Sequence, residues 1–142
     1  MPLKRSGFTP FRSLRNELRS VNVSKKILLA EDHTDIREMM ATYLKLNGYE
    51  VIEASDGCEA LTQALKHKPD AILMDIAMPV LNGIDSTRAM RKNKELKLVP
   101  IVCLTAFGEL YIERAKRAGC NAVLQKPIDF AELDALLLQH TY

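Results

Sequence analysis

The 142 residues suit one domain, and they are numerous enough to bury a core without metal or disulfide support. Apolar residues make up 47% of the chain, yet no apolar run approaches the roughly 20 residues that span a bilayer, which excludes a transmembrane helix. The net charge of +2 is unevenly distributed: residues 1–26 hold seven basic residues and one acid, whereas residues 27–142 hold 13 basic and 17 acidic residues. The mildly acidic segment 27–142 gives no electrostatic reason to expect direct DNA binding.

From Lys26 onward, short apolar runs alternate with longer amphipathic ones. Residues 26–30 predict a buried strand, because four consecutive apolar residues leave no polar face. We expect Thr34 to cap the helix that follows, and Asn47-Gly48 to end it. A second strand is then predicted at 50–54 and a second helix at 57–67.

The second half of the chain repeats the same alternation. Residues 71–75 predict a third buried strand that is apolar up to its final acid, Asp75. The remaining predicted elements are a helix over about 84–93, a strand over 100–105, a helix over 109–118 ended by Gly119, a short strand over 122–125, and a final helix capped by Asp129. Five strand-helix repeats predict an α/β fold with a parallel sheet and helices on both faces.

Polar residues stand where four of the five predicted strands end, namely Glu31 and Asp32, Asp75, Thr105, and Lys126. The carboxyl ends of parallel strands meet at one edge of a sheet, where ligands bind. Three carboxylates gathered there repel one another unless a hard cation such as Mg²⁺ lies among them. A lysine and a hydroxyl nearby suit an anion on that metal, so the set predicts a phosphoryl-transfer site.

At residues 25–140 the sequence resembles the receiver domains of two-component response regulators. The resemblance rests on Leu28-Leu-Ala-Glu-Asp32, Met74-Asp-Ile-Ala-Met-Pro79 with Gly83, Leu104-Thr-Ala106, and Lys126-Pro127. It implies a flavodoxin-like, doubly wound five-stranded sheet of order 2-1-3-4-5. It also implies that Asp75 accepts a phosphoryl group from a histidine kinase or a histidine phosphotransfer protein.

The same resemblance implies roles for the surrounding residues. Lys126 and Thr105 would contact phosphoryl oxygens, and the Lys126-Pro127 bond would be cis. Mg²⁺ would be bound by Asp32, Asp75 and the backbone carbonyl of Ala77, with Glu31 acting through water. His33 follows the acidic pair, but Mg²⁺ prefers oxygen ligands, so we expect a helix-entry histidine without a role in the site.

Three positions depart from the usual receiver pattern. Val123 stands where many receivers have an aromatic residue that moves with the threonine, and Tyr111 is expected to be an ordinary core or surface residue rather than its substitute. The residues two after Asp75 and two after Thr105 are Ala77 and Phe107. The resemblance implies that these two positions flank the route of the water that hydrolyses the aspartyl phosphate. Neither side chain can hydrogen-bond that water, which predicts slow self-dephosphorylation.

We therefore predict a receiver domain over residues 25–142 and a basic N-terminal extension over residues 1–24. The extension contains either a short amphipathic helix that starts at Thr9-Pro10 or a frayed tail. We expect no DNA-binding module, because the sequence reaches Tyr142 just after the last predicted helix, although a receiver excised from a larger regulator or hybrid kinase would look the same. We expect a signalling switch that catalyses only its own phosphorylation and dephosphorylation, not an enzyme.

The cysteines indicate the redox environment of the protein. The three cysteines, Cys58, Cys103 and Cys120, form no CxxC pair, so we expect buried free thiols in a reducing, cytoplasmic environment. The downstream protein target and a phosphorylation-dependent dimer stay open. The alternative function is a receiver-like adaptor that acts without phosphorylation, and the intact acidic set argues against it.

Overall fold

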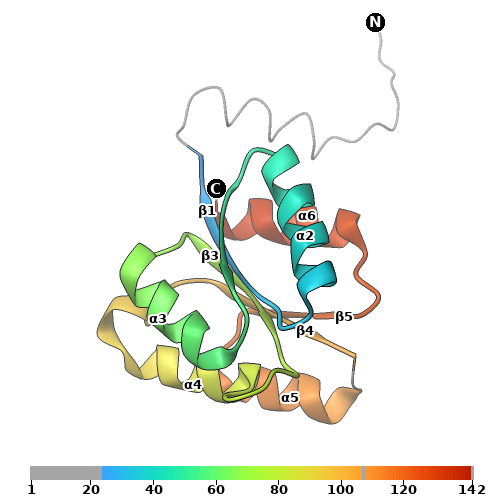
Figure 1. Cartoon of the computed structure of the whole chain (residues 1–142). Helices are drawn as coiled ribbons and strands as arrows, with labels where there is room; N and C mark the ends of the chain where they lie inside the picture. The colour runs from blue at the N-terminus through green and yellow to red at the C-terminus, as the bar shows by residue number, and fades with distance from the viewer. Residues whose placement is uncertain (1–23, 107, 142) are drawn as a thin grey trace, which may run out of the picture.

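The computed structural model describes residues 24–106 and 108–141 (Figure 1). The predicted helix within residues 1–24 lies outside this range, as does Phe107. The elements alternate along the chain as β1 (Lys26–Ala30), α2 (Thr34–Leu46), β2 (Glu50–Ala54), α3 (Gly57–His67), β3 (Ala71–Asp75), α4 (Gly83–Lys92), η1 (Lys94–Leu96), β4 (Ile101–Thr105), α5 (Glu109–Ala118), β5 (Ala122–Gln125) and α6 (Phe130–Thr141). No helix in the described ranges is long and apolar enough to cross a membrane.

The strands of the described chain form one five-stranded parallel sheet in the order β2-β1-β3-β4-β5. This confirms the predicted fold class and strand order. The central strand β3 and its neighbour β4 are buried along their whole length. Because helices cover both faces of the sheet, these strands contain apolar residues on both sides until they end at Asp75 and Thr105.

The sheet separates two apolar clusters. Helices α3, α4 and α5 cover one face, with Ala60, Met90 and Ala115 among the buried residues, and α2 and α6 cover the other, with Leu44 and Leu137 (Figure 1). Burying side chains of this size stabilises the fold by about 1.5–3 kcal/mol for each large one. The polar strand ends gather at the carboxyl edge of the sheet, between the two layers.

Two helix starts illustrate what the local sequence decides. Asp129 caps α6, since its Oδ1 accepts hydrogen bonds from the backbone N–H groups of Ala131 at 2.9 Å and Glu132 at 3.3 Å. The cap predicted for α2 is wrong, because the helix begins at Thr34 and the capping position falls on His33. The reason is that the His33 N–H donates to the Glu31 carboxylate at 3.1 Å, which turns the chain one residue early.

The described cysteines are free, but their burial differs from the prediction. Cys103 is buried in β4 and Cys120 is half-buried. Cys58 is exposed, which corrects the expectation of a buried thiol. It is the second residue of α3, whose inward face is formed by Gly57, Ala60 and Ala64. Helical spacing therefore turns Cys58 toward solvent.

Candidate functional site

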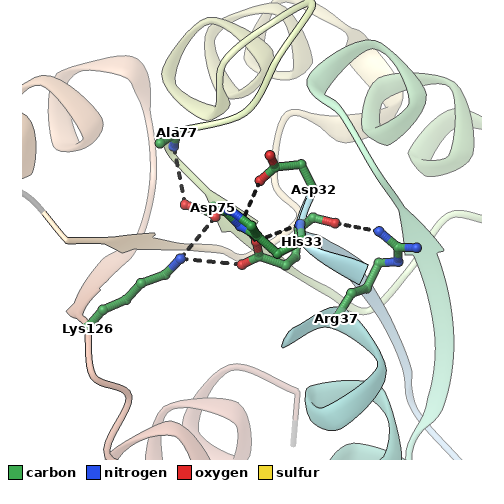
Figure 2. A network of polar contacts seen from close by, with 7 residues as sticks. Asp32, His33, Arg37, Asp75, Ala77 and Lys126 are labelled. Carbon is green, nitrogen blue, oxygen red and sulfur yellow. Dashed lines mark hydrogen bonds and ion pairs between the residues drawn. The ribbon is translucent and has the colours of Figure 1, made fainter. Parts of the chain in front are cut away.

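The ends of β1 and β3 bring the acidic residues together. The two strands are neighbours, and Ala30 lies in register with Met74, so Glu31 and Asp75 leave adjacent strands at the same level. Asp75 is 2% exposed and Glu31 is fully buried. Figure 2 shows Asp75 and Asp32 close together at the ends of these strands, and one carboxylate oxygen from each of Glu31, Asp32 and Asp75 lies within 4.8 Å of the others.

Lys126 reaches this point from the loop after β5. Its Nζ lies 3.0 Å from Asp75 Oδ2 and 3.3 Å from Glu31 Oε1, so one ammonium group bridges two buried carboxylates (Figure 2). The backbone sets its approach, because the Lys126 N–H donates to the Thr105 carbonyl at 2.8 Å. The Lys126-Pro127 peptide bond is cis, as predicted.

The crowding of acids changes the proton affinity of Asp75. Burial, followed by the side-chain hydrogen bond with Glu31, raises the pKa of Asp75 from 3.8 to about 6, against the opposing pull of Lys126. Burial also raises the pKa of Glu31, but hydrogen bonds with Asp75 and His33 and the charge of Lys126 outweigh it, and the net pKa is lowered. The pair therefore holds a proton on Asp75 at mildly acidic pH when no cation is bound.

Asp32 adds a third carboxylate to the site. Its Oδ1 is buried, yet it accepts no hydrogen bond from any residue in the described ranges. Glu31, Asp32, His33 and Asp75 each offer one ligand atom, and these four atoms lie within 4.8 Å of one another. Three carboxylate oxygens at this spacing fit a hard divalent cation such as Mg²⁺, which would be a ligand-bond partner for the Asp32 oxygen that accepts no hydrogen bond.

The loop after β3 fixes the orientation of the Asp75 carboxylate. The Ala77 N–H donates to Asp75 Oδ1 at 3.2 Å, opposite the oxygen that Lys126 contacts. Gly83 then starts α4 against this backbone, with its N–H donating to the Ile76 carbonyl at 2.9 Å. A Cβ at Gly83 would overlap the carbonyl of Asp75, so only glycine permits this approach.

Two residues join the site that the sequence did not assign to it. The Nδ1 of His33 lies 3.0 Å from Glu31 Oε2 and 3.4 Å from Asp32 Oδ1, so the ring lies against the acidic pair. The Glu31 hydrogen bond and the charges of Asp32 and Glu31 raise the pKa of His33. Arg37 donates to the Glu31 carbonyl at 2.8 Å and pairs with Glu53 at 3.1 Å. Its position one turn after His33 on α2 was the available signal.

Of the remaining predicted residues, Thr105 lies at the same edge, whereas Tyr111 lies on α5 and Val123 within β5. Thr105 is buried at the end of β4, next to Leu104, which is in register with Asp75. Tyr111 packs half-buried against the α3–α5 core cluster, with the Arg114 guanidinium 5.4 Å from its ring centroid, as expected for an ordinary tyrosine. Val123 lines a surface hollow of about 510 Å³ between α5, β5 and α6.

The apolar residues beside this hollow divide between core and surface. Leu133 and Leu137 of α6 are fully buried, whereas Leu110 of α5 is 61% exposed. Ile112 and Leu136 are half-buried and line the hollow together with Lys116 and Gln125. The surface made by α5, β5 and α6 therefore combines apolar and charged groups around Val123.

Comparison with known proteins gives a consistent result. The family model for the response regulator receiver domain matches residues 27–138. The fold is similar to that of the chemotaxis protein CheY4 of Vibrio cholerae, with a TM-score of 0.76 and 34% identity over 84% of this chain and 100% of that one. The receiver domain of a Pseudomonas aeruginosa sensor histidine kinase, with a magnesium ion coordinated in its active site cleft, matches with a TM-score of 0.79 and 36% identity over 84% of this chain and 98% of that one.

Similarity also extends to characterised regulators. The transcriptional regulatory protein PdtaR of Mycobacterium tuberculosis is 42% identical over 113 residues, which are 78% of this chain but 54% of that protein. The chain thus spans about half the length of PdtaR. The polar-differentiation response regulator DivK of Brucella ovis is 35% identical over 107 residues, which are 75% of this chain and 87% of that protein.

Proposed function

The chain belongs to the response regulator receiver domain family, and from this premise we propose that Asp75 accepts a phosphoryl group and thereby switches the binding of a protein partner. One observation carries the proposal: the buried Asp75 carboxylate is held between a lysine and an acidic pair at the carboxyl edge of the sheet. Burying an acid beside two other acids costs the folded state free energy, which favours a chemical role for Asp75 over a structural one.

The proposed reaction moves a phosphoryl group from a phosphohistidine of a histidine kinase or phosphotransfer protein. A carboxylate oxygen of Asp75 attacks phosphorus, an O–P bond forms, the N–P bond breaks, and the histidine imidazole leaves with the bonding electron pair. Lys126, already 3.0 Å from Asp75 Oδ2, would pair with a phosphoryl oxygen, and the Thr105 hydroxyl would hydrogen-bond another. Catalysis is limited to the protein's own phosphorylation and dephosphorylation.

The donor set at the site suits Mg²⁺. Asp32, Asp75 and the backbone carbonyl of Ala77 would bind it directly, and Glu31 would act through water. The bound ion would neutralise charge on the carboxylates and on the incoming phosphoryl oxygens. The unsatisfied Oδ1 of Asp32 supports this assignment.

Readout would use the surface made by α5, β5 and α6. Its hollow of about 510 Å³ could take an apolar side chain of a downstream protein, with Lys116 and Gln125 at the rim. Because Val123 is smaller than the aromatic residue of many receivers, we propose that partner binding depends on the hollow itself rather than on movement of a ring. The protein would act in the cytoplasm, without binding DNA directly.

Mass spectrometry of the intact protein tests the phosphoacceptor role. Incubation with acetyl phosphate and Mg²⁺ should add the mass of one phosphoryl group, and hydroxylamine, which cleaves acyl phosphates, should remove it. Asp75→Asn should abolish the adduct, whereas Asp85→Asn, which changes an exposed aspartate on α4, should retain it. A folded protein that never gains the adduct would instead support an adaptor that acts without phosphorylation.

A further inference from the structure

His33 is placed to contact a cation bound by the acidic residues. Its Nδ1 lies 3.0 Å from Glu31 Oε2 and 3.4 Å from Asp32 Oδ1, on the side of the cluster away from Lys126 (Figure 2). Lys126 contacts the other Glu31 oxygen, Oε1, so the two basic side chains do not compete for one position. The acids are therefore approached by a lysine from one side and by an imidazole from the other.

The local backbone holds the ring in this position. The His33 N–H donates to the same Glu31 oxygen that Nδ1 contacts, at 3.1 Å, so main chain and side chain of His33 share one anchor. The side chain makes no hydrogen bond that caps α2, and it is 65% exposed, so neither capping nor core packing explains its direction. The contacts of the ring with the Glu31 and Asp32 carboxylates therefore account for its direction.

An imidazole nitrogen changes which cations the site favours. Mg²⁺ prefers oxygen ligands, whereas neutral imidazole is a good ligand for Ni²⁺, Zn²⁺ and related ions. One atom from each of Glu31, Asp32, His33 and Asp75 lies within 4.8 Å of the others, which is close enough for a single ion to contact all four after small side-chain movements. In the metal-free protein Nδ1 donates to Glu31 Oε2, so a bound ion would replace that proton. With the remaining proton on the exposed Nε2, Nδ1 would then present its lone pair to the ion.

We propose that His33 is a ligand of the divalent-cation centre and shifts its selectivity from Mg²⁺ toward first-row transition-metal ions. The inference rests on the proposed metal centre and adds a nitrogen donor to it. The centre would then accept Mg²⁺ through its carboxylates alone and a transition-metal ion through carboxylates plus imidazole. The occupant would depend on which ion is available.

Calorimetric titration of the untagged protein with Ni²⁺ and with Mg²⁺ tests this selectivity. His33→Phe keeps a flat ring at an exposed position but removes the nitrogen. It should lower the Ni²⁺ affinity by about tenfold or more while leaving the Mg²⁺ affinity unchanged or higher. His67→Phe, which removes a histidine remote from the cluster at the end of α3, should change neither. An equal loss for both ions, or no loss for Ni²⁺, would overturn the proposal.

A second readout observes the ligand itself. In spectra of protein labelled with ¹⁵N in histidine, Zn²⁺ should shift the Nδ1 resonance of His33, and Mg²⁺ should not. Asp32→Asn tests the metal centre separately from the nitrogen ligand, because it should weaken the binding of both ions. If Asp32→Asn left Mg²⁺ binding intact, the metal centre itself would be wrong; if only the His33 results failed, the centre would stand and the nitrogen ligand would not.

Discussion

Replacing Asp75 by asparagine should stabilise the metal-free protein at neutral pH. Burial and the neighbouring Glu31 raise the pKa of Asp75 from 3.8 to about 6. An unfolded chain therefore releases this proton near pH 3.8, whereas the folded protein retains it to about pH 6. The stability linked to the retained proton is complete below the lower value and is lost as the pH rises through the higher one.

The magnitude follows from the size of the shift. One pKa unit corresponds to about 1.4 kcal/mol, so the ionised Asp75 should cost the folded state about 2–3 kcal/mol above pH 7. Asparagine has nearly the same shape and stays neutral, so Asp75→Asn should avoid this cost. In a domain of this size, that corresponds to a melting temperature higher by roughly 5–10 °C.

Urea unfolding in the presence of a chelator is the appropriate assay, with wild-type protein and Asp75→Asn compared at pH 5 and pH 7.5. The difference in free energy of unfolding should grow by about 1 kcal/mol between the two pH values. Glu38→Gln, which neutralises an exposed acid on α2, serves as the control and should show little change. The cost assigned to ionised Asp75 would be refuted if the variant were no more stable than the wild type at pH 7.5, or if the difference in free energy of unfolding were the same at pH 5 and pH 7.5.

Three further predictions concern the loop after β3 and the lifetime of the phosphoryl group. Gly83→Ala should lower the urea midpoint, with a loss of about 1–3 kcal/mol or more, because the new methyl group overlaps the Asp75 carbonyl; an unchanged midpoint would contradict that packing. Val80 has a φ of 68°, a left-handed conformation that strains a β-branched residue and that asparagine adopts more easily, and its side chain is 77% exposed. Val80→Asn should therefore raise the free energy of unfolding by about 0.5–1 kcal/mol in the same assay, and a loss of stability would contradict this strain. The phosphorylated protein should lose its label slowly, because neither Ala77 nor Phe107 can hydrogen-bond water; a half-life of seconds in Mg²⁺ that Phe107→Glu leaves unchanged would contradict this.

The sequence was most informative where burial and chemistry act on consecutive residues. In β3, four apolar residues followed by Asp75 predict both a central strand and an acid at its carboxyl end, and the structure has that strand over the predicted residues. The start of α4 differs from the prediction by one residue, since Asn82 caps it and Gly83 begins it. The strand order came from the resemblance to receivers, because periodicity does not specify which strands pair.

What the sequence did not predict depends on side-chain direction and on layers that form only in the folded chain. His33 follows an acidic pair in many conceivable geometries, and only the hydrogen bond of its backbone to Glu31 turns the ring toward the acids. Leu110 and Leu133 have the same hydrophobicity, yet one is exposed and the other buried, because α6 packs over the sheet while Leu110 lies at the start of α5. Periodicity alone does not separate such cases.

The central claim is that Asp75 itself receives the phosphoryl group, and peptide mapping after borohydride reduction tests it most directly. Borohydride converts an aspartyl phosphate to homoserine, which marks the modified position permanently. After treatment with acetyl phosphate and Mg²⁺, homoserine should appear at residue 75 and nowhere else, and it should be absent when Mg²⁺ is removed. Homoserine at Asp32 or another position, or labelling that persists without a divalent cation, would contradict the account.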